Sequence, residues 1–175
     1  MPIKTIFLDR DGVINKEVNY LYKIKDFEFL EGIFNACIYF QKLGYEIIII
    51  TNQSGIHRGY YDESAFNKLT SWMLGEFEIN NIKILDVFHC PHGPDSNCEC
   101  RKPKPGMLLN AKNKYNINMS NSWMIGDKSD DIIAANNSGV HNTILLRSGH
   151  KIIESSSNAK FIFDSIIDSK KVITS

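Results

Sequence analysis

The 175-residue chain lacks the features that mark nucleic-acid-binding and membrane proteins. It has no excess of either charge, because 20 lysine and arginine residues balance 20 aspartate and glutamate residues. A neutral chain does not offer the basic face that a phosphate backbone selects. The isoleucine run at residues 47–50 is far too short to span a bilayer. We therefore expect neither nucleic acid nor a membrane as a partner.

We expect no leader segment from the first residues, and the chain has little cysteine. MPIKTIFLD enters a strand-like segment directly, without a basic region followed by an apolar stretch. Four cysteines occur, and three of them fall within residues 90–100. In a reducing compartment such a cluster favours a metal site over disulfides. We expect a cytoplasmic protein that holds a metal in this segment.

What the chain does contain is an alternation of strand and helix patterns. Strands are predicted at residues 4–9, 45–51, 84–89, 122–127 and 142–146, with a short strand at 161–163. Helices are predicted from about residue 30 to Gly44, after a cap at Asp62, from Pro105 to about 115, before Gly139 and at the C-terminal end. Repeated β-α units imply an α/β, Rossmann-like parallel sheet with helices on both faces.

The length bounds the domain organisation. A chain of 175 residues is enough for one domain with a substantial core. The longest irregular stretches, residues 12–29 and 90–105, are too short for a separate cap domain. We predict a single domain over residues 1–175, with an open site beyond the carboxyl ends of the strands and substrate selected by loops.

The first strand ends in a pair of aspartates. The apolar run at residues 6–8 leads to Asp9 and Asp11, and Gly12 breaks the strand. Residues two apart in a strand point to the same side, so the two carboxylates would share one volume and need a cation or a proton. This arrangement suits a Mg²⁺-assisted carboxylate nucleophile with a neighbouring acid/base. Asp-x-Asp-Gly is also common in ordinary turns, and on this motif alone both interpretations stay open.

Other segments supply matching groups. Thr51 and Asn52 end the second strand, where a hydroxyl and free backbone N–H groups can hold phosphoryl oxygens. Lys102, next to Pro103, can neutralise a phosphate. Asp127 would complete an oxygen-rich Mg²⁺ site with the paired aspartates. A strand exit, a surface charge and a helix cap would explain each of these residues singly, but their joint occurrence favours a site.

These motifs resemble those of the haloacid dehalogenase-like hydrolases over about residues 4–147. FLDRDGVIN matches the nucleophile motif, TNQ the second, Lys102 the third and GDKSDD the fourth. DRDGVIN, ITNQSGIHRGYY, CPH with CECRKPKPGM, and IGDKSDD are most similar to the D-glycero-D-manno-heptose 1,7-bisphosphate phosphatases and their histidinol-phosphatase relatives.

The resemblance implies a mechanism. Asp9 would attack phosphorus and form an aspartyl-phosphate. Asp11 would protonate the leaving oxygen and then take a proton from the hydrolytic water. Mg²⁺, held by Asp9, Asp11 and Asp127, would offset the repulsion between anions. Thr51 and Lys102 would stabilise the transferring phosphoryl group.

The resemblance also implies substrate contacts from the surrounding loops. Arg101 and Lys128 would meet a second phosphate or sugar hydroxyls, and Asp131 would support the loop after the fourth strand. The predicted substrate-binding set is Glu17, Tyr20, Asn52, Gln53, Ser54, Arg58, Arg101 and Lys128. Arg58 is explained equally well as a surface residue. The lone loop histidines, including His150, are given no role because such residues are more often solvated.

The cysteine cluster has the composition of a zinc site. Its members are Cys90, His92, Cys98 and Cys100, in the pattern C-x-H-x5-C-x-C. Three thiolates and one imidazole make a complete tetrahedral Zn²⁺ set, and the lack of an open position indicates a structural metal. Free thiols with a chance histidine are the alternative. Because Arg101 and Lys102 follow directly, we predict that this zinc-binding loop fixes both cations.

The resemblance implies an enzyme, a phosphoric monoester hydrolase that removes the C7 phosphate of a heptose 1,7-bisphosphate. That step supplies nucleotide-activated heptose for lipopolysaccharide. Histidinol phosphate is an alternative substrate, because the motifs are shared. A zinc-stapled binding module without catalysis is an alternative of another class, disfavoured because the nucleophile and metal carboxylates are present. We expect a small sugar bisphosphate as the binding partner, and a monomer.

Overall fold

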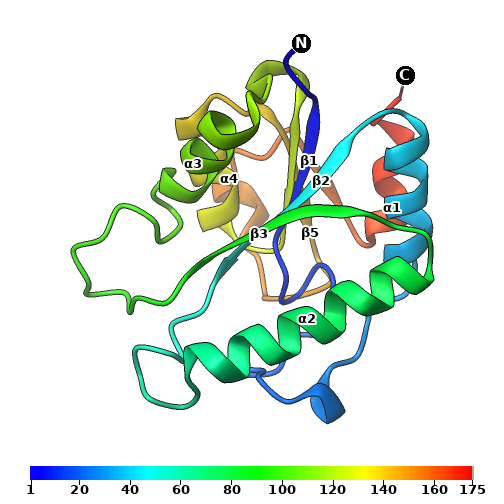
Figure 1. Ribbon diagram of the computed structural model, residues 1–175. Coiled ribbons are helices and arrows are strands. Elements are labelled where there is room, and N and C mark those ends of the chain that lie inside the picture. Colours follow the sequence, from blue (N-terminus) through cyan, green and yellow to red (C-terminus); the bar gives the residue numbers. More distant parts are fainter. Residues whose placement is uncertain (175) are drawn as a thin grey trace.

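The computed structural model describes residues 1–174 and forms one six-stranded sheet of order β3-β2-β1-β4-β5-β6 (Figure 1). The strands are β1 (Thr5–Leu8), β2 (Glu46–Asn52), β3 (Ile84–Cys90), β4 (Trp123–Gly126), β5 (Asn142–Leu146) and β6 (Phe161–Phe163). The α-helices are α1 (Ile33–Lys42), α2 (Glu63–Ile79), α3 (Gly106–Tyr115) and α4 (Ser129–Ser138). Every strand pair is parallel, which confirms the predicted α/β fold.

Short 3-10 helices complete the chain. They are η1 (Ile24–Asp26), η2 (Met119–Asn121), η3 (Glu154–Ser156) and η4 (Ile166–Lys171). The last of them stands where a final helix was predicted, and it differs in being a 3-10 helix. Its buried residues are Ile166 and Ser169. Residues three apart lie on the same side of a 3-10 helix, so η4 buries these two residues on the side that packs against the core.

The strands place alternate residues in two cores, one on each face of the sheet. Ile6 and Leu8 of β1 pack on the face that α1, α2 and η4 cover. Phe7 of β1 and Ile48 and Ile50 of β2 pack on the face that α3 and α4 cover. Figure 1 shows α1 on one side of the sheet and α3 and α4 on the other. Across residues 1–174, no helix has the length and apolar character to cross a bilayer.

The strand order brings the ends of β1 and β4 together. β1 lies between β2 and β4, so the order of the sheet reverses at this point, where such folds bind ligands. The backbone N–H of Asp9 donates to the carbonyl of Ile125 at 3.1 Å. Gly12 then turns with φ +86°, and a Cβ there would lie 2.2 Å from Oδ2 of Asp127. Only glycine allows this close approach between the two strand ends.

The predicted cap of α2 is confirmed, and it gives a stability prediction. The Asp62 side chain accepts a hydrogen bond from the backbone N–H of Ala65 at 2.8 Å. We expect Asp62→Ala to lower the free energy of unfolding by about 1 kcal/mol, because a helix-end N–H loses its partner. Asp62→Asn keeps an acceptor and should be close to wild type in urea denaturation. An equal loss in both variants would contradict the capping role.

Candidate active site

A buried group of charges lies where β1 and β4 end. Nζ of Lys102 is 2.9 Å from Oδ1 of Asp9 and 2.6 Å from Oδ1 of Asp131. It also donates to the carbonyl oxygen of Ile50 at 2.7 Å. Burial opposes the charge of Lys102, but Asp131 and Asp9 hold its pKa above the ordinary value. Lys102 is therefore a fixed ammonium beside the predicted nucleophile.

The same group has the donor set of a divalent cation site. Oxygens of Asp9, Asp127 and Asp131 lie within 4.8 Å of one another. Burial, together with Asp9 and Asp131, raises the pKa of Asp127, and its Oδ1 has no hydrogen-bond partner among residues 1–174. One ammonium does not balance three carboxylates. Mg²⁺ would supply both the missing charge and the missing partner, so these residues fit it.

Both carboxylate oxygens of Asp131 have partners within the protein. Its Oδ1 pairs with Lys102, and its Oδ2 accepts from the backbone N–H groups of Asp127 and Lys128, both at 3.1 Å. Asp131 therefore fixes the start of α4 and the ammonium of Lys102. Within the group, Asp9 and Asp127 are left with oxygens that can face an ion.

Asp11, the third predicted magnesium ligand, lies outside this group. Its Oδ1 accepts from Nδ2 of Asn15 at 3.0 Å and from Nη2 of Arg10 at 3.1 Å. Its Oδ2 accepts from Nε2 of Gln53 at 3.2 Å. The Asp11 side chain is 19% exposed and that of Asp9 is 11% exposed, and both residues line the cleft. The two aspartates thus have different partners, because Asp9 pairs with Lys102 in the buried group and Asp11 is held by Arg10, Asn15 and Gln53.

Thr51 and Asn52, the two predicted phosphate-binding residues, lie at the end of β2 and are held there by hydrogen bonds. The buried hydroxyl of Thr51 accepts from Nε2 of Gln53 at 2.8 Å. Nδ2 of Asn52 donates to the carbonyl of Lys102, and the backbone N–H of Lys102 donates to Oδ1 of Asn52, each at 3.0 Å. This reciprocal pair clamps the backbone of Lys102 to the sheet. Sequence reasoning did not assign Asn52 that role, because no local pattern links residues 50 positions apart.

A cleft of about 260 Å³ opens over these groups. All the predicted substrate-binding residues line it: Glu17, Tyr20, Asn52, Gln53, Ser54, Arg58, Arg101 and Lys128. Burial, with Asp11 as the next contributor, raises the pKa of Glu17 to about 7. At the rim, the ring of Tyr20 lies 4.7 Å from that of Tyr60, and the guanidinium of Arg58 lies 5.8 Å from the Tyr20 ring. Four segments distant in sequence, at the ends of β1, β2, β3 and β4, therefore meet around one cavity.

His150, which sequence reasoning set aside, also lines the cleft. Its backbone N–H and its Nδ1 lie 2.8 and 2.6 Å from Oδ2 of Asp127. Its Nε2 lies 3.8 Å from Glu17. Burial and the charge of Lys128 lower the pKa of the imidazole. The sequence position of His150 could have identified it as a site residue, because it follows the predicted strand at 142–146, at the edge of the sheet where ligands bind.

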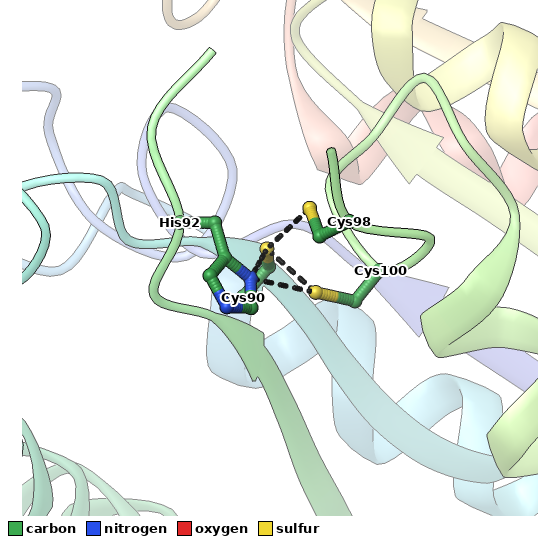
Figure 2. Close-up of side chains that lie close together, drawn as sticks. All are labelled: Cys90, His92, Cys98 and Cys100. Atoms are coloured by element: carbon green, nitrogen blue, oxygen red, sulfur yellow. Dashed lines mark hydrogen bonds between the residues drawn. The ribbon is translucent and has the colours of Figure 1, made fainter. Parts of the chain in front are cut away.

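The cysteine cluster forms at the end of β3. Figure 2 shows its four side chains pointing toward one another. Sγ of Cys90 lies 3.8 Å from Sγ of Cys98, and Nδ1 of His92 lies 3.3 and 3.2 Å from the sulfurs of Cys90 and Cys100. A tetrahedral zinc with Zn–S bonds of about 2.3 Å would separate two sulfurs by about 3.8 Å. Burial, and then Cys100, raise the pKa of the Cys90 thiol, and a cation would offset this. The four side chains are the ligands of a tetrahedral zinc ion, and the Cys90–Cys98 distance matches one, whereas the sulfurs of Cys90 and Cys100, 2.8 Å apart, would have to separate by about 1 Å to bind it.

Comparisons with known proteins agree with this geometry. A family model described as HAD-hydrolase-like matches residues 99–169. A D-glycero-alpha-D-manno-heptose-1,7-bisphosphate 7-phosphatase of Campylobacter jejuni is 52% identical over 151 residues, 86% of this chain and 87% of that protein. A D-glycero-beta-D-manno-heptose-1,7-bisphosphate 7-phosphatase of Vibrio cholerae is 44% identical over 176 residues, 96% and 95% of the two chains.

A solved structure shares the whole fold. The D,D-heptose 1,7-bisphosphate phosphatase from B. bronchiseptica, complexed with magnesium and phosphate, superposes with a TM-score of 0.83. It is 28% identical and covers 97% of each chain. With relatives this similar over almost its full length, the chain belongs to the haloacid dehalogenase-like hydrolases and, within them, to the family of D-glycero-D-manno-heptose-1,7-bisphosphate 7-phosphatases.

Proposed function

We propose that this chain is a Mg²⁺-dependent phosphatase that hydrolyses the C7 phosphate ester of a D-glycero-D-manno-heptose 1,7-bisphosphate. The observation that carries the proposal is the buried carboxylate group beside Lys102 at the floor of a cleft. The walls of that cleft carry Arg58, Arg101 and Lys128. A bisphosphate needs positive charge at both of its ends, and this cleft offers charge at its floor and along its walls.

In the proposed reaction, Asp9 attacks phosphorus and becomes an aspartyl-phosphate while the leaving sugar oxygen departs. Asp11, at the cleft wall, gives that oxygen its proton and later takes a proton from the water that hydrolyses the intermediate. Lys102 and Thr51 stabilise the phosphoryl group. Asp9 and Asp127 would hold Mg²⁺, which would supply positive charge to offset repulsion between nucleophile and substrate. Asp11 as a further ligand stays a prediction of the sequence.

The remaining cleft residues would select the sugar. Arg101, Lys128 and Ser54 line the cleft; the two cations would hold the second phosphate, and the hydroxyl of Ser54 would contact the sugar. Because burial raises the pKa of Glu17 to about 7, its carboxyl can donate or accept a hydrogen bond near neutral pH. Tyr20 presents an exposed ring at the rim. These contacts would distinguish a heptose from smaller phosphate esters.

The cysteine cluster is proposed as a structural Zn²⁺ site. Its four protein ligands leave no open position for substrate or water. Three thiolates persist in a reducing compartment, which supports a cytoplasmic location. We also propose that residues 1–175 act as one phosphatase domain and as a monomer, as the sequence predicts.

The test is phosphate release, with Mg²⁺, from the α and β heptose 1,7-bisphosphates beside histidinol phosphate. We expect the highest kcat/KM for the α anomer, because the relative named for α shares 52% identity with this chain against 44% for the relative named for β. Omission of Mg²⁺ should stop release. Preference for histidinol phosphate would keep the mechanism and change the substrate. No phosphate release from any of the three substrates would instead support a zinc-stapled binding module.

A further inference from the structure

A chain of buried hydrogen bonds ends on Asp11. The hydroxyl of Tyr61 donates to Oε1 of Gln53 at 2.5 Å, and Nε2 of Gln53 donates to Oδ2 of Asp11 at 3.2 Å. The second N–H of that amide donates to the hydroxyl of Thr51 at 2.8 Å. Gln53 is 3% exposed and Tyr61 is 8% exposed. The amide of Gln53 is therefore fully used within the protein, with no donor left over for a substrate.

The partners of Gln53 determine which atom of its amide faces Asp11 and which faces Tyr61. Nε2 of Gln53 lies toward both Oδ2 of Asp11 and the hydroxyl of Thr51, and a lone pair of a carboxyl oxygen accepts from an N–H. The carbonyl oxygen of Gln53 then faces Tyr61, whose hydroxyl must donate. The reversed amide would aim an oxygen at the carboxylate. Burial raises the pKa of Tyr61 to about 12, so that its hydroxyl remains a donor near neutral pH.

Packing sets the place of Tyr61 from two sides. Its ring stacks on that of Tyr22, with centroids 5.3 Å apart and planes at 12°. On another side lies Gly55, where an added Cβ would be 2.2 Å from Cε1 of Tyr61. The hydroxyl that orients Gln53 is thus held by the loops at residues 12–29 and 53–62 rather than by the sheet.

These hydrogen bonds leave the two carboxyl oxygens of Asp11 unequally occupied. Oδ1 is occupied by Asn15 and Arg10, whereas Oδ2 accepts from Gln53 alone. Because each carboxylate oxygen has about two acceptor sites, Oδ2 keeps the open one. We propose that Gln53, oriented by Tyr61, is a positioning residue that holds the open site of Asp11 Oδ2 toward the leaving oxygen. This role rests on the proposed phosphatase function.

The test compares two esters that differ in how much they need an acid. Protonation matters for a sugar oxygen and little for 4-nitrophenolate, which leaves readily as an anion. The parameter to measure is kcat/KM, because it covers the reaction steps from substrate binding up to and including departure of the leaving group. We expect Gln53→Leu to lower kcat/KM for heptose 1,7-bisphosphate by about 10- to 100-fold and to change that for 4-nitrophenyl phosphate by less than about threefold. Tyr61→Phe should show the same selectivity with a smaller loss.

A double variant tests whether Tyr61 acts through Gln53. If it does, Gln53→Leu combined with Tyr61→Phe should be no slower than Gln53→Leu alone. Tyr22→Phe is the matched control, because it belongs to the same stack and its hydroxyl has no hydrogen-bond partner among residues 1–174. It should leave both esters unchanged.

The outcomes separate the alternatives. Equal losses on both esters, no loss on either, or additive losses in the double variant would overturn the positioning role. Phosphate release from neither ester by the wild-type protein would overturn the phosphatase activity itself, and the positioning role with it. Circular dichroism melts check that each variant is folded. Tyr61→Phe, which removes a single atom, carries the test if Gln53→Leu does not fold.

Discussion

Replacing Asp9 by asparagine is expected to abolish phosphate release while the fold is retained. Asparagine nearly matches aspartate in shape, but its amide oxygen is too weak a nucleophile to form the covalent intermediate. We expect kcat to fall by at least about 10³-fold, as is usual when a nucleophile is removed. The measurement is Mg²⁺-dependent phosphate release from heptose 1,7-bisphosphate, with the melting temperature recorded beside it.

The buried charges explain why the fold should survive this change. Lys102 keeps Asp131 as an ionic partner at 2.6 Å, so its ammonium is not left unpaired. Removing one negative charge also relieves the repulsion that raises the pKa of Asp127. Asp62→Asn is the matched control, because it makes the same chemical change outside the cleft and should retain full turnover. Undiminished phosphate release by Asp9→Asn would exclude Asp9 as the nucleophile.

The fold was predictable because its signals are local. Ile47–Ile50 are buried on both sides, as a continuous β-branched run predicts for a central strand. Asp62 and Gly139 stand at helix ends because their chemistry suits those positions. The order of the strands was not readable in this way, since it depends on pairings between distant segments.

Only the site residues at or next to the strand ends could be predicted from strand periodicity. The rule that residues two apart share a side placed Asp9 and Asp11 together, but β1 ends at Leu8 and Asp11 lies in the turn that follows. Beyond the strand that periodicity no longer applies, and Asp11 turns toward Asn15 and Gln53. The partners of Gln53 and His150 depend on loop conformations, for which the sequence carries no periodic signal.

Loss of the proposed zinc ion is expected to weaken substrate binding more than turnover. Cys98→Ser removes one thiolate from the cluster, so we expect the metal to be lost and the melting temperature to fall. The guanidinium of Arg101 donates to the carbonyl of His92 at 3.2 Å, so a loosened loop releases Arg101 from the cleft wall. We expect KM for heptose 1,7-bisphosphate to rise about tenfold or more, as for a lost hydrogen bond to a charged group.

Lys102 should be affected less, although it is the next residue. Its backbone is clamped by Asn52, and its ammonium is held by Asp9, Asp131 and the carbonyl of Ile50. None of these partners belongs to the zinc-binding loop, so kcat should fall less than KM rises. Cys37→Ala is the control, because that thiol lies on the buried face of α1, away from the cluster, and its loss should leave the zinc content unchanged.

Zinc content, KM and kcat together decide between two ways in which the loop can act. A rise in KM alone means that zinc holds Arg101 for substrate while the sheet holds Lys102 for chemistry. A fall in kcat at constant KM would mean that the Asn52 clamp is not sufficient and that zinc fixes Lys102 itself. Full activity without zinc would contradict both, and the loop would then serve stability alone.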